Sequence, residues 1–178
     1  MKSRLALCLL GAWLLGSLML FVVAPTNFHL IDQLLADSTN ARFRELSQQL
    51  GSGTVRELLR YLASELNRVF FLRWNVAQVL IGGLALWGCW GANEQRARWP
   101  ALAALVLVLV LLGVLTPWIT SVGRSLDFVP REPAPPQLAR FQLLHVLYTG
   151  LDLFKVVLVA LATYRLLREA RVARAPTH

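Results

Sequence analysis

Four ionisable side chains lie between positions 145 and 155 of the last apolar run of the sequence, residues 141–164. They are His145, Tyr148, Asp152 and Lys155, the last three at offsets of 3, 7 and 10 from the first. At 100° per residue these offsets place all four within about 80° of one another on a helix, so they form one polar stripe. A stripe of this kind either fixes the rotation of its helix or takes part in transport or proton relay.

The depth of the two charged residues limits how they can be accommodated. Asp152 follows Phe141 by about 16 Å of helix, which places it near the middle of a hydrocarbon core about 30 Å thick. An unpaired charge there costs at least about 3 kcal/mol. Lys155 is the nearest counter-charge. We therefore expect the two to pair, and the stripe to face other helices or trapped water.

The composition of the whole chain indicates a membrane protein. Of 178 residues, 56% are hydrophobic and only 16% are charged, and the mean hydropathy is +0.54. The net charge of +8 comes from basic residues at the ends of apolar runs, without an aromatic-interleaved patch, so we expect contact with the lipid bilayer and not with nucleic acid. Cys8 and Cys89 stand alone in apolar runs, which indicates free thiols.

The sequence predicts an all-α integral membrane protein of one domain, residues 1–178, with four transmembrane helices in a bundle. The expected spans are about 5–25, 70–91, 99–122 and 141–164, joined by an amphipathic helical segment 26–69 and a Pro-rich loop 124–140, and followed by a basic tail 165–178. Lys2 and Arg4 before the first run resemble the start of a signal peptide. The run is long enough to span a membrane, however, and its one candidate cleavage site, residues 22–24, is followed by Pro25. We therefore expect an uncleaved signal anchor.

Several boundaries can be predicted in more detail. Pro25 should end or bend the first helix, and Pro117 should kink or end the third. Between the first two spans a short helix should begin near Asn40 and stop at 51–53. Thr54 and Glu57 have the spacing of a capping box, which predicts one long helix over 55–90.

The second and first spans carry further polar and aromatic side chains. Asn75 and Gln78 share one side of the second span and should face the bundle. Arg73 is close enough to the end of the span for its head group to reach the membrane surface. In the first span, Trp13 and Phe21 are expected to contact lipid or to pack.

Orientation follows from the distribution of Lys and Arg outside the spans. Eight lie on the side of the termini and eight in the two longer loops. Because those on the terminal side occupy about half as many residues, we predict both termini in the cytoplasm, with the protein in a bacterial inner (plasma) membrane.

Cofactor and enzyme chemistry have little support in the sequence. His29 and His145 fall on one side of the membrane, as a haem site would require, but two histidines are a weak signal, and we expect no cofactor and no metal. No HExxH, GxSxG, P-loop or dinucleotide motif is present, so no catalytic residue is assigned and an enzyme is not expected.

Three local patterns at span ends resemble those of the transmembrane protein 205-like family. They are Val23-Ala24-Pro25 with Phe28, Leu115-Thr116-Pro117, and Phe141-x-x-Leu144-His145. The resemblance implies four membrane helices and shared positions at Pro25, Phe28, Pro117, Phe141 and His145, and it supplies no established reaction. The segment from about Leu30 to Arg68 is longer than the family pattern, and Asp152 and Lys155 do not map onto it.

Taken together, these patterns favour a multi-pass membrane protein that acts as an accessory, interaction or structural subunit. It would assemble either with further copies of itself or with a different membrane protein. The alternative is a small oligomeric transporter or proton-relay protein that uses the stripe of the fourth span.

Overall fold

The computed structural model describes residues 2–91, 95–130 and 132–172, and all regular structure in these ranges is helical. The elements are α1 (Lys2–Asp37), α2 (Ala41–Leu50), α3 (Ser52–Gly91), α4 (Gln95–Val110), the π-helical turn η1 (Leu111–Leu115), α5 (Thr116–Arg124) and α6 (Pro136–Val172). Four helical segments are long and apolar enough to cross a membrane: Lys2–Asp37, Ser52–Trp90, Gln95–Arg124 and Pro136–Glu169. This confirms the predicted all-helical class and four candidate spans.

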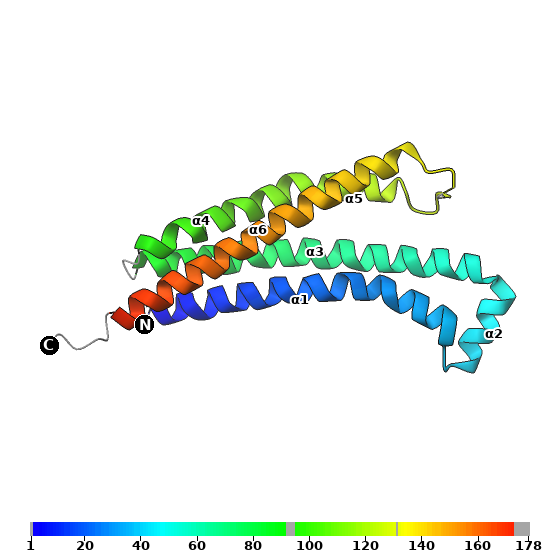
Figure 1. Ribbon diagram of the computed structural model, residues 1–178, viewed down its shortest axis with the longest axis horizontal. Helices are drawn as coiled ribbons and strands as arrows, with labels where there is room; N and C mark the ends of the chain where they lie inside the picture. Colours follow the sequence, from blue (N-terminus) through cyan, green and yellow to red (C-terminus); the bar gives the residue numbers. More distant parts are fainter. Residues whose placement is uncertain (1, 92–94, 131, 173–178) are drawn as a thin grey trace.

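The four long segments run side by side (Figure 1). The start of α1, the end of α3, the start of α4 and the end of α6 lie at one end of the molecule, which we call the terminal end. α2 and the connection between α5 and α6 lie at the opposite end, which we call the α2 end. α1 packs against α3 and α6, and α4 packs against the same two helices.

α1 continues through Pro25 to Asp37 and curves over its second half (Figure 1). Proline lacks an amide hydrogen and so weakens the helix at this point. The hydroxyl of Thr26 donates to the carbonyl oxygen of Val22 at 2.7 Å, a side-chain bond that is often found where helices bend. Pro25 therefore does not end the helix.

The predictions for α2 are confirmed. The side chain of Asn40 accepts from the amide of Phe43 at 3.0 Å and caps the helix, which ends at Gly51 with a φ of +82°. The long helix α3 is also confirmed, but it begins at Ser52. The predicted capping box at Thr54 and Glu57 is therefore wrong, because Thr54 already lies inside the helix.

The third span is continuous but irregular. In η1 the amide of Thr116 bonds to the carbonyl oxygen of Leu111, five residues earlier. This wider turn comes directly before Pro117, which cannot donate a hydrogen bond, and the helix then continues to Arg124.

The last helix is longer than the predicted span at both ends. α6 begins at Pro136, so residues 136–140, expected in the Pro-rich loop, are helical. It also extends to Val172, well into the segment expected as a basic tail. The rest of that segment, residues 173–178, lies outside the described residues.

Candidate functional site

Lys155 of α6 is completely buried in the middle of the bundle. Its ammonium group donates to Asp152 Oδ1 and to Gln78 Oε1, each at 2.5 Å. Asp152 lies one turn earlier on the same helix face, as residues three apart do. The predicted pair is therefore formed within α6, and an amide oxygen of α3 is the second acceptor for the lysine.

Gln78 connects this ion pair to α1. Its Oε1 also accepts from Trp13 Nε1 at 2.8 Å and, at a longer 3.5 Å, from Ser17 Oγ. Its Nε2 donates to Asn75 Oδ1 at 3.0 Å. One side chain of α3 thus joins α1, α3 and α6.

Asn75 extends the connections to the third span. Its Nδ2 donates to Thr116 Oγ1 at 3.0 Å and to the hydroxyl oxygen of Tyr148 at 2.8 Å. Thr116 belongs to α5 and Tyr148 to α6, so all four long segments share one set of buried hydrogen bonds. We call this set the central polar network: Trp13, Ser17, Asn75, Gln78, Thr116, Tyr148, Asp152 and Lys155.

Sequence reasoning missed three members of the network. Trp13 was expected to contact lipid or to pack, but it is completely buried and donates a hydrogen bond. Ser17 lies one turn after it, and Thr116 was noted only as part of the Leu115-Thr116-Pro117 pattern. The one available signal was a hydroxyl in an apolar run. That signal is weak, because a helical Ser or Thr can also bond to its own backbone.

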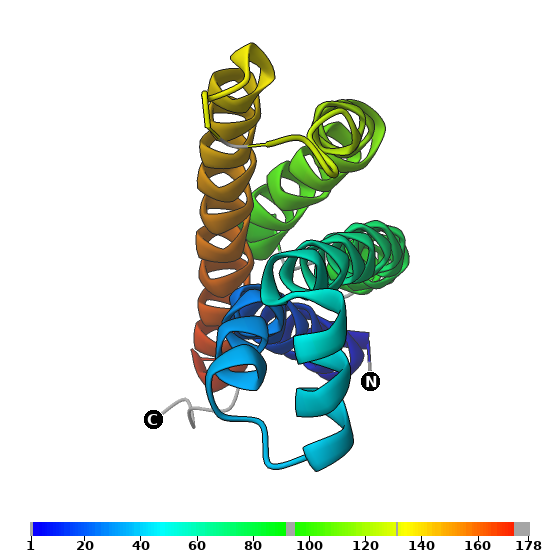
Figure 2. The same cartoon turned by 90° about the vertical axis from the view of Figure 1, so that its right-hand side faces the viewer.

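A cavity of about 550 Å³ adjoins the network on the side of the α2 end. Its walls come from α1, α3, α5 and α6: Leu20, Phe21, Ala24, Pro25, Phe28, Ser64, Asn67, Arg68, Phe71, Thr116, Ile119, Thr120, Gly123, Phe141, His145, Tyr148, Thr149 and Asp152. Figure 2, which looks onto the α2 end, shows α5 and α6 diverging from α1 and α3. Aromatic and aliphatic groups form most of this wall, with a few hydroxyls, amides and charges among them.

Asp152 marks the closed end of the cavity. Among the cavity residues of α6 it is the furthest from the α2 end, and Lys155, one turn beyond, is not part of the wall. The Asp152 side chain is 11% exposed, whereas that of Lys155 is 0% exposed. The inner boundary of the cavity therefore passes between the two members of the ion pair.

Beyond the network, the terminal end is filled by small side chains. Its buried core consists of Ala6, Leu10, Trp13, Ala85, Cys89, Ala97, Ala101, Ala104, Val108, Val159, Ala162 and Leu166. Alanines let helix backbones approach closely. A Cβ added at Gly88 would meet Ala6 at 3.0 Å, which shows how close α1 and α3 come here. Access to Asp152 in this structure is therefore from the α2 end.

Polar contacts hold together the elements that surround the outer part of the cavity. The guanidinium of Arg68 donates to both carboxylate oxygens of Asp127, at 2.8 and 2.9 Å, and to Glu65 Oε1 at 2.5 Å. Asn67 Nδ2 donates to the carbonyl oxygen of Ala24 at 3.1 Å, and Asn67 Oδ1 accepts from Asn27 at 2.7 Å. These bonds connect α3 to the turn after α5 and to α1, and they balance the charge of Arg68.

Most of the span-end motif positions fall on the same cavity. Pro25, Phe28, Phe141 and His145 all contribute to its wall. His145 is the outermost member of the predicted stripe, is exposed, and stacks on Phe141 with 6.1 Å between ring centroids. Pro117 is exposed and is not part of the wall.

The two histidines considered for haem lie in different surroundings. His29 is exposed on α1, with its Nε2 3.1 Å from Gln33 Nε2. Within residues 2–91, 95–130 and 132–172, His, Cys, Asp and Glu form no group of three or more that could hold a metal ion. Neither histidine belongs to the central polar network.

No family model, curated protein or solved structure matches the chain. The chemistry of the site must therefore come from its own residues. A carboxylate that is paired with a buried ammonium group and borders a cavity can accept a proton or a hydrogen bond from a molecule in that cavity. The apolar walls strengthen any such interaction, because they lower the local dielectric constant.

Proposed function

We propose that the four long helices cross a bacterial plasma membrane, with the terminal end in the cytoplasm. The polarity of the bundle supports insertion, since large apolar side chains such as Leu15, Leu80 and Leu143 are exposed while the polar network is buried. The dense basic residues near the termini support the orientation. A fluorescent protein fused after His178 should then fluoresce, and alkaline phosphatase inserted after Asn40 should be active.

We propose further that the protein is a small oligomeric transport or proton-relay protein, and that Asp152 is the group that receives the transported proton or cation. The observation that carries this proposal is the position of Asp152 at the closed end of a cavity. A pair that served only to fix helix packing would need no access, yet the carboxylate borders the cavity while the ammonium group does not.

The contacts of Asp152 indicate how such a relay would work. Lys155 stabilises the ionised carboxylate, so Asp152 is ready to accept a proton that arrives through the cavity. Protonation of Asp152 would remove the negative charge that balances Lys155. The ammonium group would then keep only the neutral amide oxygen of Gln78 as a fully polar acceptor. An isolated charge at this depth is unfavourable. The protonated state therefore favours a rearrangement of α6 against α3, which is the kind of coupling that alternating access requires.

Proton flux into proteoliposomes that contain a pH-sensitive dye tests this function. Asp152→Asn should abolish the flux of the wild-type protein, while Asp37→Asn, which changes an exposed carboxylate at the end of α1, should leave it intact. Unaltered flux in a folded Asp152→Asn protein would eliminate Asp152 as the acceptor.

An accessory or interaction subunit is the second candidate. It is favoured by the network itself, which joins all four helices and would serve equally well to hold a rigid scaffold together. Native mass spectrometry of the protein released from its own membrane distinguishes the two. A stoichiometric second polypeptide, together with no flux from the isolated chain, would establish the scaffold function. A homo-oligomer that supports flux would establish the relay.

The resemblance to the transmembrane protein 205-like family is proposed as a distant relationship. It is supported by the location of Pro25, Phe28, Phe141 and His145 around one cavity, because positions shared for a common purpose should lie together. No enzymatic reaction is proposed.

A further inference from the structure

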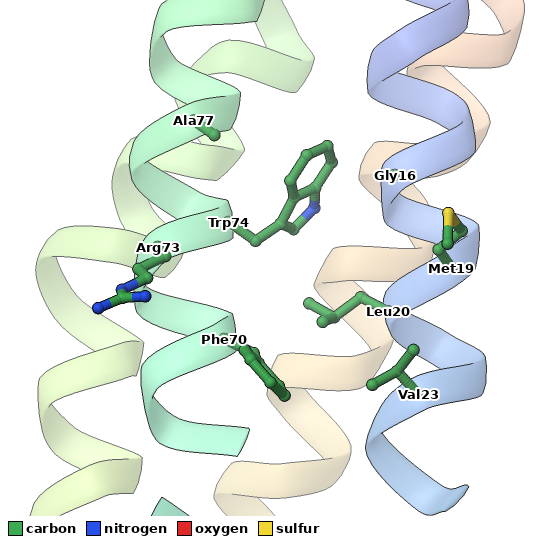
Figure 3. Close-up of a pocket in the computed structure, with 8 residues that line it drawn as sticks. All are labelled: Gly16, Met19, Leu20, Val23, Phe70, Arg73, Trp74 and Ala77. Carbon is green, nitrogen blue, oxygen red and sulfur yellow. The ribbon is translucent and has the colours of Figure 1, made fainter. Parts of the chain in front are cut away.

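A second concave surface lies between α1 and α3 (Figure 3). This groove of about 450 Å³ is open to the surroundings and is lined by Gly16, Met19, Leu20, Val23, Phe70, Arg73, Trp74 and Ala77. Leu20 is the one residue that it shares with the cavity beside Asp152. In the figure Phe70 and Trp74 of α3 point toward the α1 residues across the groove, whereas the side chain of Arg73 extends from the other side of α3, away from α1.

The groove depends on a glycine. The six-membered ring of Trp74 lies so close to Gly16 that a Cβ at this position would collide with it. The indole Nε1 of Trp74 is buried, and no described group of the protein bonds to it. Apart from Arg73, the groove is lined by apolar surface, and the unsatisfied Nε1 of Trp74 is buried beside it.

Arg73 is the charged residue of the groove. It is exposed, and no acidic side chain within the described ranges pairs with it. Arg68, five residues earlier on the same helix, is bonded to both Asp127 and Glu65. Arg73 lies three residues, or about 4.5 Å, inside the predicted start of the span at Phe70. A guanidinium at this level is stabilised when its head group reaches an anion at the membrane surface.

We propose that the groove binds an anionic phospholipid, with the phosphate at Arg73 and an acyl chain between α1 and α3. The apolar floor from Gly16 to Val23 is about 10 Å long, which suits part of an acyl chain. The guanidinium is a bidentate donor that matches phosphate. A symmetric contact with a second copy of the chain would instead bring two Arg73 charges together, so charge complementarity favours the lipid.

Native mass spectrometry of delipidated protein, incubated with phosphatidylglycerol or with phosphatidylcholine, tests the proposal. The wild-type protein should retain phosphatidylglycerol several-fold more than phosphatidylcholine. Arg73→Gln should remove this preference, whereas Arg73→Lys, which keeps the charge but not the bidentate geometry, should keep part of it. The control Arg60→Gln, which changes an exposed arginine of α3 ten residues before the predicted span at Phe70, should keep it in full. Ala77→Phe, which fills the groove, should reduce retention of both lipids.

Two results would overturn the proposal. One is an unchanged lipid preference in Arg73→Gln with its thermal unfolding intact. The other is a dimer that Ala77→Phe dissociates while the number of bound lipids stays the same, since this would make the groove an interface between copies. The test does not involve Asp152, so its outcome is independent of the proposed relay.

Discussion

Breaking the Asp152–Lys155 pair one residue at a time should destabilise the protein far more than removing both charges together. Lys155→Met leaves the carboxylate without its cation, and Asp152→Asn leaves the ammonium group with Gln78 as its remaining acceptor. Removing one partner of a buried pair typically costs about 3 to 5 kcal/mol. Lys155→Met should fall at the lower end, because Asp152 borders the cavity and can be hydrated. Asp152→Asn should fall at the upper end of this range, because the side chain of Lys155 is completely buried and cannot be hydrated.

The double variant Asp152→Asn with Lys155→Met contains neither charge. The oxygen of Gln78 keeps its bond from Trp13. The remaining loss is therefore about one or two ordinary hydrogen bonds, or about 1 to 2 kcal/mol. The double variant should be more stable than either single variant, so the two substitutions should be strongly non-additive.

Equilibrium unfolding in mixed micelles, followed by circular dichroism, measures all four proteins. Arg56→Met is the matched control, because it breaks the pair with Asp32 at the α2 end, where both side chains are largely exposed, 45% and 61%. It should cost less than about 1 kcal/mol. If the double variant loses as much stability as the two single variants combined, the charges are not coupled, and the account given for Lys155 fails.

Other contacts lead to further predictions. Gly82→Ala should lower stability by about 1 to 3 kcal/mol, because its Cβ would come within 2.7 Å of the Trp13 ring; thermal unfolding of Gly83→Ala, whose Cβ meets nothing within 4 Å, is the control. Tyr148→Phe removes one acceptor of Asn75 and should cost about 1 kcal/mol in the same assay; no loss would mean that Thr116 satisfies the amide alone. Arg68→Gln should weaken the attachment of the turn after α5 by about 1 to 3 kcal/mol. Faster hydrogen exchange of residues 125–130 would show it, and unchanged exchange would contradict it.

The sequence was informative where one physical term dominates. Long apolar runs predict four candidate spans, and the polar residues before Asn40 together with the Gly-Ser-Gly sequence at 51–53 predict the bounds of α2. The spacing of Asp152 and Lys155 predicts their pairing, because both must lie on one helix face. Each of these inferences uses local geometry alone.

The remaining features depend on contacts between helices, which local patterns do not contain. Of the two outcomes predicted at Pro25, the helix bends and does not end, and α3 begins at Ser52, two residues before the predicted cap at Thr54. Trp13 belongs to the polar network only because Gln78 of another helix faces it. The cavity likewise arises from the divergence of α5 and α6 from α1 and α3, which no single run of residues encodes (Figure 2).

The order of the two charges along α6 decides what a molecule in the cavity would meet. α6 runs from the α2 end to the terminal end, so Asp152 precedes Lys155 along the direction of access. A species that arrives through the cavity would pass Arg68, which is already paired with Asp127 and Glu65, and would then meet Asp152 before Lys155. If Asp152 is the receiving group, as proposed, the incoming species would be a proton, a cation or a hydrogen-bond donor, because an anion would face the carboxylate in a low-dielectric site. The reverse order on the same helix would have placed the ammonium group at the cavity and favoured an anion, so under the proposed relay this one-turn offset would select the charge of the transported species.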